Sequence, residues 1–233
     1  MLPALVGIFL ALKYPAKNID MQQSRELFRP VTGNQSDFTL AVARFQVEVV
    51  RKSLHLLIAL VPVLASVNLP ATLSILAAGT LFYAFAEASR RQGNPILVVS
   101  DITIIASRER DRNGFVLGPV TLGLGAMLSL LLYPLPAASI AIFALAFGDG
   151  FASLIGTLLR GPKIPFLGGK TLAGSMACFA AVFLFTLRIT MNPVNALVVA
   201  GAATLLEAIP AGNFDNIIIP FGVGLVATQL LAR

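Results

Sequence analysis

Several apolar runs, each close to the length that crosses a lipid bilayer, dominate this chain of 233 residues. A helix needs roughly 17–25 mainly apolar residues to span the membrane. Charged residues make up only 12% of the chain, about half of their usual share in a soluble domain. The sequence therefore predicts an all-α, polytopic integral membrane protein with about 7–8 transmembrane helices. The runs are residues 53–67, 71–88, 115–133, 137–159, 172–189, 194–209 and 217–231.

The remaining segments connect these runs. Residues 1–12 are apolar but short, so they are only a candidate first span, and residues 13–37 form a polar connection. Residues 38–52 are expected to form an amphipathic helix that continues into the first long run. Residues 96–106 are apolar but too short to span, so we expect them to lie at the membrane interface.

Basic residues gather in three of the connections. Of the 17 Lys and Arg residues, residues 13–52 hold seven, residues 89–114 hold five and residues 159–171 hold three. These connections share one face if each intervening apolar block is a two-helix hairpin. The positive-inside rule then places that face in the cytoplasm. It also explains the net charge of +6 without nucleic-acid binding. A bacterial or archaeal plasma membrane suits the chain better than the endoplasmic reticulum.

Asp149 interrupts the run 137–159, and a carboxylate inside a membrane helix is costly and by default a candidate functional residue. Glycines, lysines and hydroxyls follow it, a set that suits a metal-bound polyphosphate. These are Gly156, Lys163, Gly168, Gly169, Lys170, Thr171, Gly174 and Ser175. The alternative is helix packing through the small residues that follow Asp149. The segment is not a P-loop, since Ile164 stands where that motif needs its first glycine.

A second cluster precedes the first long run. Glu48, Arg51, Lys52 and His55 are spaced i, i+3, i+4 and i+7, so they share one helix face. The alternative for the basic residues is a juxtamembrane anchor with a Glu48–Lys52 ion pair. The only histidine of the chain fits that alternative less well.

A third cluster lies between residues 207 and 220. Glu207, Asp215 and Asn216 bring oxygen ligands to the face on which Asp149 is expected. The alternative is a proline-bounded turn in which Asp and Asn are turn formers. Three such clusters on one face favour an enzyme over a transporter, whose polar residues should lie near the midplane in related halves.

In order and spacing, these motifs resemble those of the CTP-dependent membrane lipid kinases, which comprise dolichol, phytol and farnesol kinases and CTP-dependent diacylglycerol kinase. The resemblance covers residues 48–220. It rests on Arg51-Lys52-x-x-His55, Glu87, Asp149-x-x-Ala152-x-x-x-Gly156, Gly169-Lys170-Thr171-x-x-Gly174-Ser175, Glu207-x-x-Pro210 and Asp215-Asn216-x-x-Ile219-Pro220. The related CDP-diacylglycerol synthases share part of it, but their K-R-x-x-x-x-K-D signature is absent here.

The resemblance implies a single membrane-embedded kinase domain over residues 1–233, with residues 38–220 as its catalytic core. It implies transfer of the γ-phosphate of CTP to a lipid alcohol such as a polyprenol, a phytol-like alcohol or diacylglycerol. Asp149 and Asp215 would hold Mg²⁺, and His55 or Glu207 would be the base. Nucleotide contacts would come from Arg51, Lys52, Asn216 and the residues from Gly156 to Ser175 named above. A phosphatidate cytidylyltransferase and a small-solute transporter remain the alternatives, and the oligomeric state stays open.

Overall fold

The computed structural model describes residues 34–107, 114–159 and 169–232. The candidate first span at residues 1–12 lies outside this part, as do Lys163 and Gly168. Every element of regular structure in the described part is helical, which confirms the all-α class. The elements are α3 (Asn34–Leu57), a 3₁₀ turn (Ile58–Leu60), α4 (Val61–Val67), α5 (Leu69–Arg91), α6 (Leu97–Ala106), α7 (Gly118–Leu132), α8 (Leu135–Phe143), a π-helical segment (Ala144–Asp149), α9 (Gly150–Leu159), α10 (Leu172–Thr190), α11 (Pro193–Ala208) and α12 (Asp215–Leu231).

Within the described residues, four helical stretches are long and apolar enough to cross a membrane. They are Val47–Val67, Leu69–Arg91, Leu135–Leu159 and Leu172–Thr190. Three shorter apolar helices, α7, α11 and α12, have 15 to 17 residues. Large apolar side chains such as Leu81 and Leu205 point outward, as lipid-facing residues do. The polytopic membrane class is confirmed, and the number of spans stays a prediction.

The helices pack through small side chains. α10 packs against α9 and α11, and α12 packs against α7, α8 and α11. Alanines at 137, 144, 200 and 203 are essentially inaccessible in the shared core. Without a strong hydrophobic drive between helices in lipid, such residues let backbones approach closely enough for dispersion contacts.

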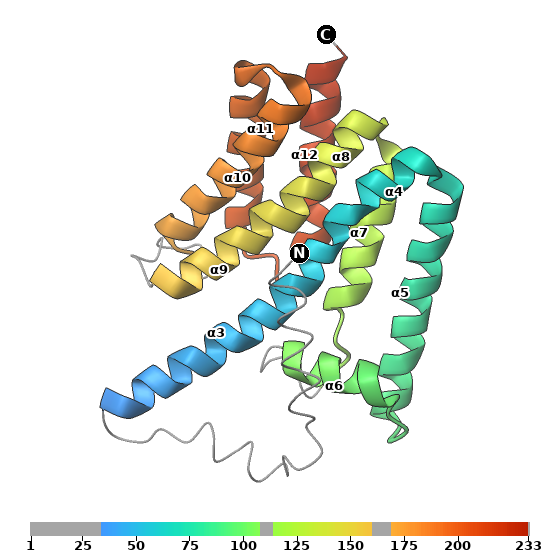
Figure 1. The fold of residues 1–233 in the computed structure, drawn as a ribbon, viewed down its shortest axis with the longest axis vertical. Helices are drawn as coiled ribbons and strands as arrows, with labels where there is room; N and C mark the ends of the chain where they lie inside the picture. Colours follow the sequence, from blue (N-terminus) through green and yellow to red (C-terminus); the bar gives the residue numbers. More distant parts are fainter. Residues whose placement is uncertain (1–33, 108–113, 160–168, 233) are drawn as a thin grey trace.

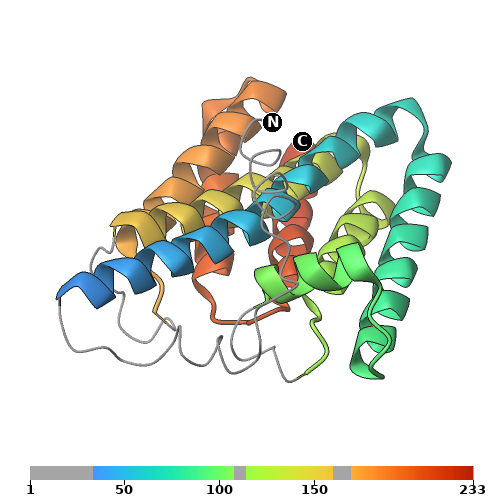
Figure 2. The same ribbon diagram turned by 60° about the horizontal axis from the view of Figure 1, so that its bottom comes forward.

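The bundle has two unlike ends. Figures 1 and 2 show the end of α5, the whole of α6, the end of α9 and the starts of α7 and α12 together at one end. We call this the loop end. The α4–α5, α7–α8 and α10–α11 turns lie at the other. Arg90 and Arg91, two of the basic residues that the sequence placed on a common face, stand in the last turn of α5 at this end. The cytoplasmic location of the loop end stays a prediction.

Candidate active site

Asp149 ends a π-helical segment that the sequence did not reveal. Residues 137–159 were expected to form one regular helix, but the stretch from Ala144 to Asp149 winds more widely. Such π segments are rare and are frequent at functional sites. Gly148 and Gly150 flank the carboxylate, and a Cβ at Gly148 would lie only 2.9 Å from Val182 of α10. The two glycines are the one local signal for this departure.

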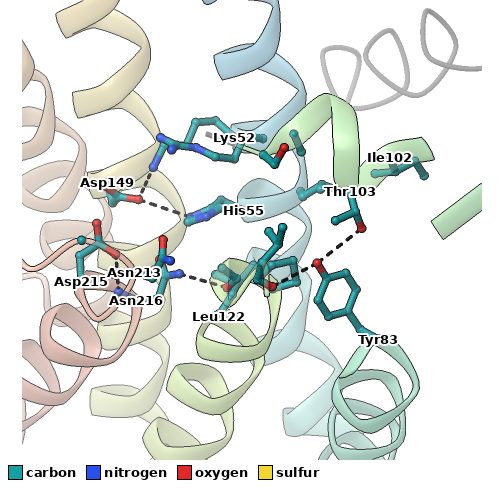
Figure 3. A pocket seen from close by; sticks show the side chains of 18 of the residues that line it. Lys52, His55, Tyr83, Ile102, Thr103, Leu122, Asp149, Asn213, Asp215 and Asn216 are labelled. Carbon is teal, nitrogen blue, oxygen red and sulfur yellow. Dashed lines mark hydrogen bonds and ion pairs between the residues drawn. The ribbon is translucent and has the colours of Figure 1, made fainter. Parts of the chain in front are cut away.

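Two basic side chains of α3 meet at Asp149. Lys52, only 1% exposed, makes an ion pair with the Asp149 carboxylate, which is itself 3% exposed. Nδ1 of His55 lies 3.4 Å from the same carboxylate oxygen. Figure 3 shows both side chains reaching Asp149 from one face of α3, as their i, i+3 spacing predicts. A buried carboxylate is stable only when such partners compensate its charge.

Glu48 and Arg51 tie α3 to α9 beside this cluster. Arg51 pairs with Glu48, and its guanidinium lies 3.4 Å from Oγ of Ser153. Ser153 in turn donates to Glu48. The Glu48–Lys52 pair considered from the sequence is therefore wrong, because Glu48 binds Arg51 while Lys52 reaches across to Asp149. The reason is burial: Lys52 and Asp149 are both buried, and each compensates the charge of the other.

A cavity of about 250 Å³ opens beside these residues. Its polar lining includes the α3 cluster and Asp149 on one side and the start of α12 on the other. Asn216 is held there by donating to Oγ1 of Thr121, at 2.9 Å, and to the Gly118 carbonyl, at 3.2 Å. The charged and amide residues of the lining are Arg51, Lys52, His55, Asp149, Asn213, Asp215 and Asn216, and Tyr83, Thr103 and Ser107 contribute hydroxyls. Residues from all three predicted clusters thus surround one cavity (Figure 3).

Lys170 and Glu207 form a separate pair. Lys170 precedes α10 and binds Glu207 near the end of α11. The Lys170 side chain is 28% exposed, whereas that of Glu207 is 3% exposed. Neither lines the cavity as the described residues form it. Gly169, just before Lys170, has φ of +88°, a left-handed conformation that favours glycine.

The other predicted nucleotide residues lie where α9 and α10 touch. Oγ1 of Thr171 caps α10 by accepting from the Gly174 amide at 3.1 Å. A Cβ at Gly174 would lie 2.6 Å from the Ala152 carbonyl oxygen, and one at Gly156 would lie 2.8 Å from Thr171. These residues therefore have a packing role, and their contact with a nucleotide stays a prediction. Ser175 is buried in the first turn of α10.

Glu87 is a buried carboxylate that holds a neighbouring segment. In the sequence, it was named only as part of the resemblance to the lipid kinases. Its carboxylate accepts two hydrogen bonds from Arg90, both at 2.7 Å, and one from the Val116 amide at 3.0 Å. Val116 and Gly118 line the cavity. Glu87 lies near the end of α5, and it therefore holds in place the segment that precedes α7.

The chain is similar to plant proteins over part of its length. It is 28% identical over 154 residues to the "probable phytol kinase, chloroplastic" of Triticum aestivum. It is 27% identical over 144 residues to the enzyme of that name from Zea mays. The chain is thus similar to probable phytol kinases. This confirms the predicted resemblance to membrane lipid kinases. A third phytol kinase relative, from Glycine max, is 28% identical over 133 residues.

The phytol kinase matches are partial. The wheat alignment covers 58% of this chain and 51% of the relative, so the chain spans about half the length of the curated relatives it matches. No protein-family model and no solved structure matches the chain. The relationship therefore supports a membrane lipid kinase ancestry and leaves donor, acceptor and metal to be argued from the site.

Proposed function

We propose that this protein is a lipid kinase that transfers the γ-phosphate of CTP to the hydroxyl of a membrane lipid alcohol. The phytol kinase relationship makes isoprenoid alcohols the first acceptors to test. The observation that carries the proposal is the Lys52–His55–Asp149 cluster, which is buried in a membrane bundle yet opens into a cavity. Buried ionisable residues inside a membrane bundle mark functional sites by default.

Phosphoryl transfer depends mainly on positioning and charge neutralisation. Arg51 and Lys52 supply two positive charges at the cavity wall, where phosphate oxygens can bind. Lys170 interacts electrostatically with Asp149. We assign Lys170 to the outer part of the triphosphate, with Gly169 giving the backbone its turn.

The residues present fit a magnesium ion that arrives with the nucleotide rather than a preformed metal cage. Within the described ranges, no group of three or more His, Cys, Asp or Glu residues is placed to hold a metal. Mg²⁺ commonly uses one or two protein carboxylates together with substrate phosphates. Asp149 and Asp215, which both line the cavity, would supply them. The ion would neutralise charge on the phosphates.

Of the two bases considered from the sequence, we choose His55. His55 lines the cavity, whereas Glu207 binds Lys170 away from it. In the proposed step, the acceptor oxygen forms a bond to the γ-phosphorus while the bond to the bridging oxygen breaks. CDP leaves, and the hydroxyl proton passes to His55. Asp149 orients the imidazole through its contact with Nδ1.

The test is an assay of the purified protein with CTP labelled in the γ-phosphate and a panel of alcohols. The panel comprises phytol, geranylgeraniol, a polyprenol and diacylglycerol, and ATP, GTP and UTP are donor controls. We expect label in the organic phase with an isoprenoid alcohol and CTP. Unlabelled lipid with every acceptor would refute the kinase. Pyrophosphate release that requires phosphatidate would instead establish the cytidylyltransferase, and solute uptake by reconstituted vesicles the transporter.

A further inference from the structure

The walls of the cavity are of two kinds. Charged and amide side chains come from α3, the π-helical segment and α12. The facing wall is mainly apolar and comes from α5, α6 and α7. Figure 3 shows Tyr83, Ile102 and Thr103 on the side away from Asp149, with Leu122 between the two groups. The apolar lining residues include Tyr83, Val99, Ile102, Ala106 and Leu122.

The polar atoms of the apolar wall bind one another. Oγ1 of Thr103 donates to the Tyr83 hydroxyl at 3.4 Å, and that hydroxyl donates to the Val116 carbonyl at 3.2 Å. These bonds occupy the hydroxyl protons of both side chains, and the hydroxyl of Ser107, which also lines the cavity, donates to the Ile104 carbonyl at 2.9 Å. The wall therefore presents mostly carbon to the cavity, which suits a hydrocarbon and not a phosphate.

α6 lies between this cavity and the surroundings of the bundle. It has 10 residues, too few to span a bilayer, and its outer face carries the exposed side chains of Leu97, Val98 and Ile104. Its inner face contributes Val99, Ile102, Thr103 and Ala106 to the cavity. An apolar helix at the loop end with one face outward and one face on the site is placed for a substrate that enters from lipid.

The size of the cavity limits what it encloses. A volume of about 250 Å³ lies below the roughly 300–1,000 Å³ of pockets that bury a whole drug-sized ligand. It cannot enclose both a nucleotide and a long isoprenoid. The acceptor must therefore place its hydroxyl end inside and leave the rest of its chain in the bilayer.

We infer that α6 and Tyr83 form the acceptor subsite, which binds the isoprene unit next to the hydroxyl. Ile102 is the specificity-determining residue that sets its width. The acceptor hydroxyl then faces His55, on the polar side of the same cavity. This inference rests on the proposed function, since it assigns that function's acceptor to one wall.

The test compares two isoleucines of one helix. Ile102 lines the cavity, whereas Ile104, 47% exposed, lies on the outer face. Binding of phytol without nucleotide is measured by thermal shift and by competition with a diazirine-bearing isoprenoid alcohol, whose crosslinks are mapped by mass spectrometry. Ile102→Phe should weaken binding about tenfold or more, because small volume changes in a hydrophobic pocket are worth roughly 10–200-fold. Ile104→Phe should leave binding unchanged.

Ile102→Ala is the control in case Ile102→Phe does not fold. It introduces no clash, and it should still weaken phytol binding because it removes contacts. Crosslinks on α6 in the unmodified protein complete the expected result. Equal binding by the Ile102 and Ile104 variants, or crosslinks confined to α10 and α11, would overturn the inference. Phytol binding that depends on Ile102 without phosphoryl transfer would uphold the subsite and refute the kinase. Phosphoryl transfer that is insensitive to substitution of Ile102 would uphold the kinase and refute the subsite.

Discussion

Two lysine–carboxylate pairs join distant parts of this chain, and they differ in their surroundings. The Lys52–Asp149 pair lies inside the bundle, with both side chains at most 5% exposed, and it lines the cavity. The Lys170–Glu207 pair joins the start of α10 to the end of α11, and its lysine is 28% exposed. From the sequence, both lysines were predicted to bind the phosphates of one nucleotide. In the structure, Lys52 lines the cavity and Lys170 does not, as the described residues form it.

The difference matters because burial changes what a charge pair costs. Breaking a buried pair by removing one partner costs roughly 3–5 kcal/mol, since the other charge is left uncompensated. A pair between solvent-exposed side chains contributes about 0–1 kcal/mol. The Lys170–Glu207 pair lies between these two cases, because its lysine is 28% exposed and its carboxylate 3% exposed. Charges buried inside a membrane bundle are costly and mark candidate functional sites, and of the two pairs the Lys52–Asp149 pair lines the cavity as the described residues form it.

The largest expected effect belongs to Asp149→Asn. It removes the charge that compensates Lys52 and orients His55, so phosphoryl transfer should fall on the order of a thousandfold. The thermal stability of the purified protein should fall as well, because Lys52 is then buried without a counter-charge. Transfer of labelled phosphate to phytol and thermal unfolding in detergent measure the two effects.

The double variant Lys52→Met with Asp149→Asn separates the two roles. It removes the uncompensated charge, so it should recover much of the lost stability while remaining inactive. Activity that returns together with stability would show that Asp149 acts only by compensating Lys52. The assignment of Asp149 to the reaction would then be wrong.

The next effect concerns His55, the third member of the buried cluster. His55→Gln keeps a polar side chain of similar length but removes the base, and should lower kcat about a hundredfold, at the low end for a general base. Steady-state kinetics at saturating CTP and phytol measures kcat, and an unchanged kcat would assign the base to another group.

The sequence predicted the parts of this site that depend on one helix. Periodicity placed Lys52 and His55 on a common face, and the cost of a carboxylate in an apolar run singled out Asp149. The sequence could not predict the ion pair between Lys52 and Asp149. Contacts between different helices depend on how the helices are rotated and shifted against each other. The Glu48–Lys52 pair was wrong for that reason: a local partner was the only kind that the spacing could suggest.

Two further features had little local signal. The π-helical segment before Asp149 has only the flanking glycines to indicate it. Tyr83 and Thr103 look like ordinary residues of apolar helices, and only the packing of α5, α6 and α7 brings them to the cavity wall. Residues 96–106 form the ten-residue helix α6, and their interfacial position, which was inferred from their length, stays a prediction.

The smallest effects should come from the second pair. If Lys170 holds the outer phosphates, Lys170→Met should raise the KM for CTP about tenfold, the value of one charge-assisted hydrogen bond. Its kcat at saturating CTP should stay close to that of the unmodified enzyme. Glu207→Gln should change either constant less than about threefold, since the amide oxygen still accepts a hydrogen bond from Lys170 and the lysine is partly solvated. Steady-state kinetics with CTP varied at saturating phytol measures both.

A fall in kcat for Lys170→Met as large as that for Asp149→Asn would place both lysines at the reacting phosphate. The contrast between the two pairs would then vanish, because the Lys170 side chain would have to leave Glu207 and enter the cavity when the nucleotide binds.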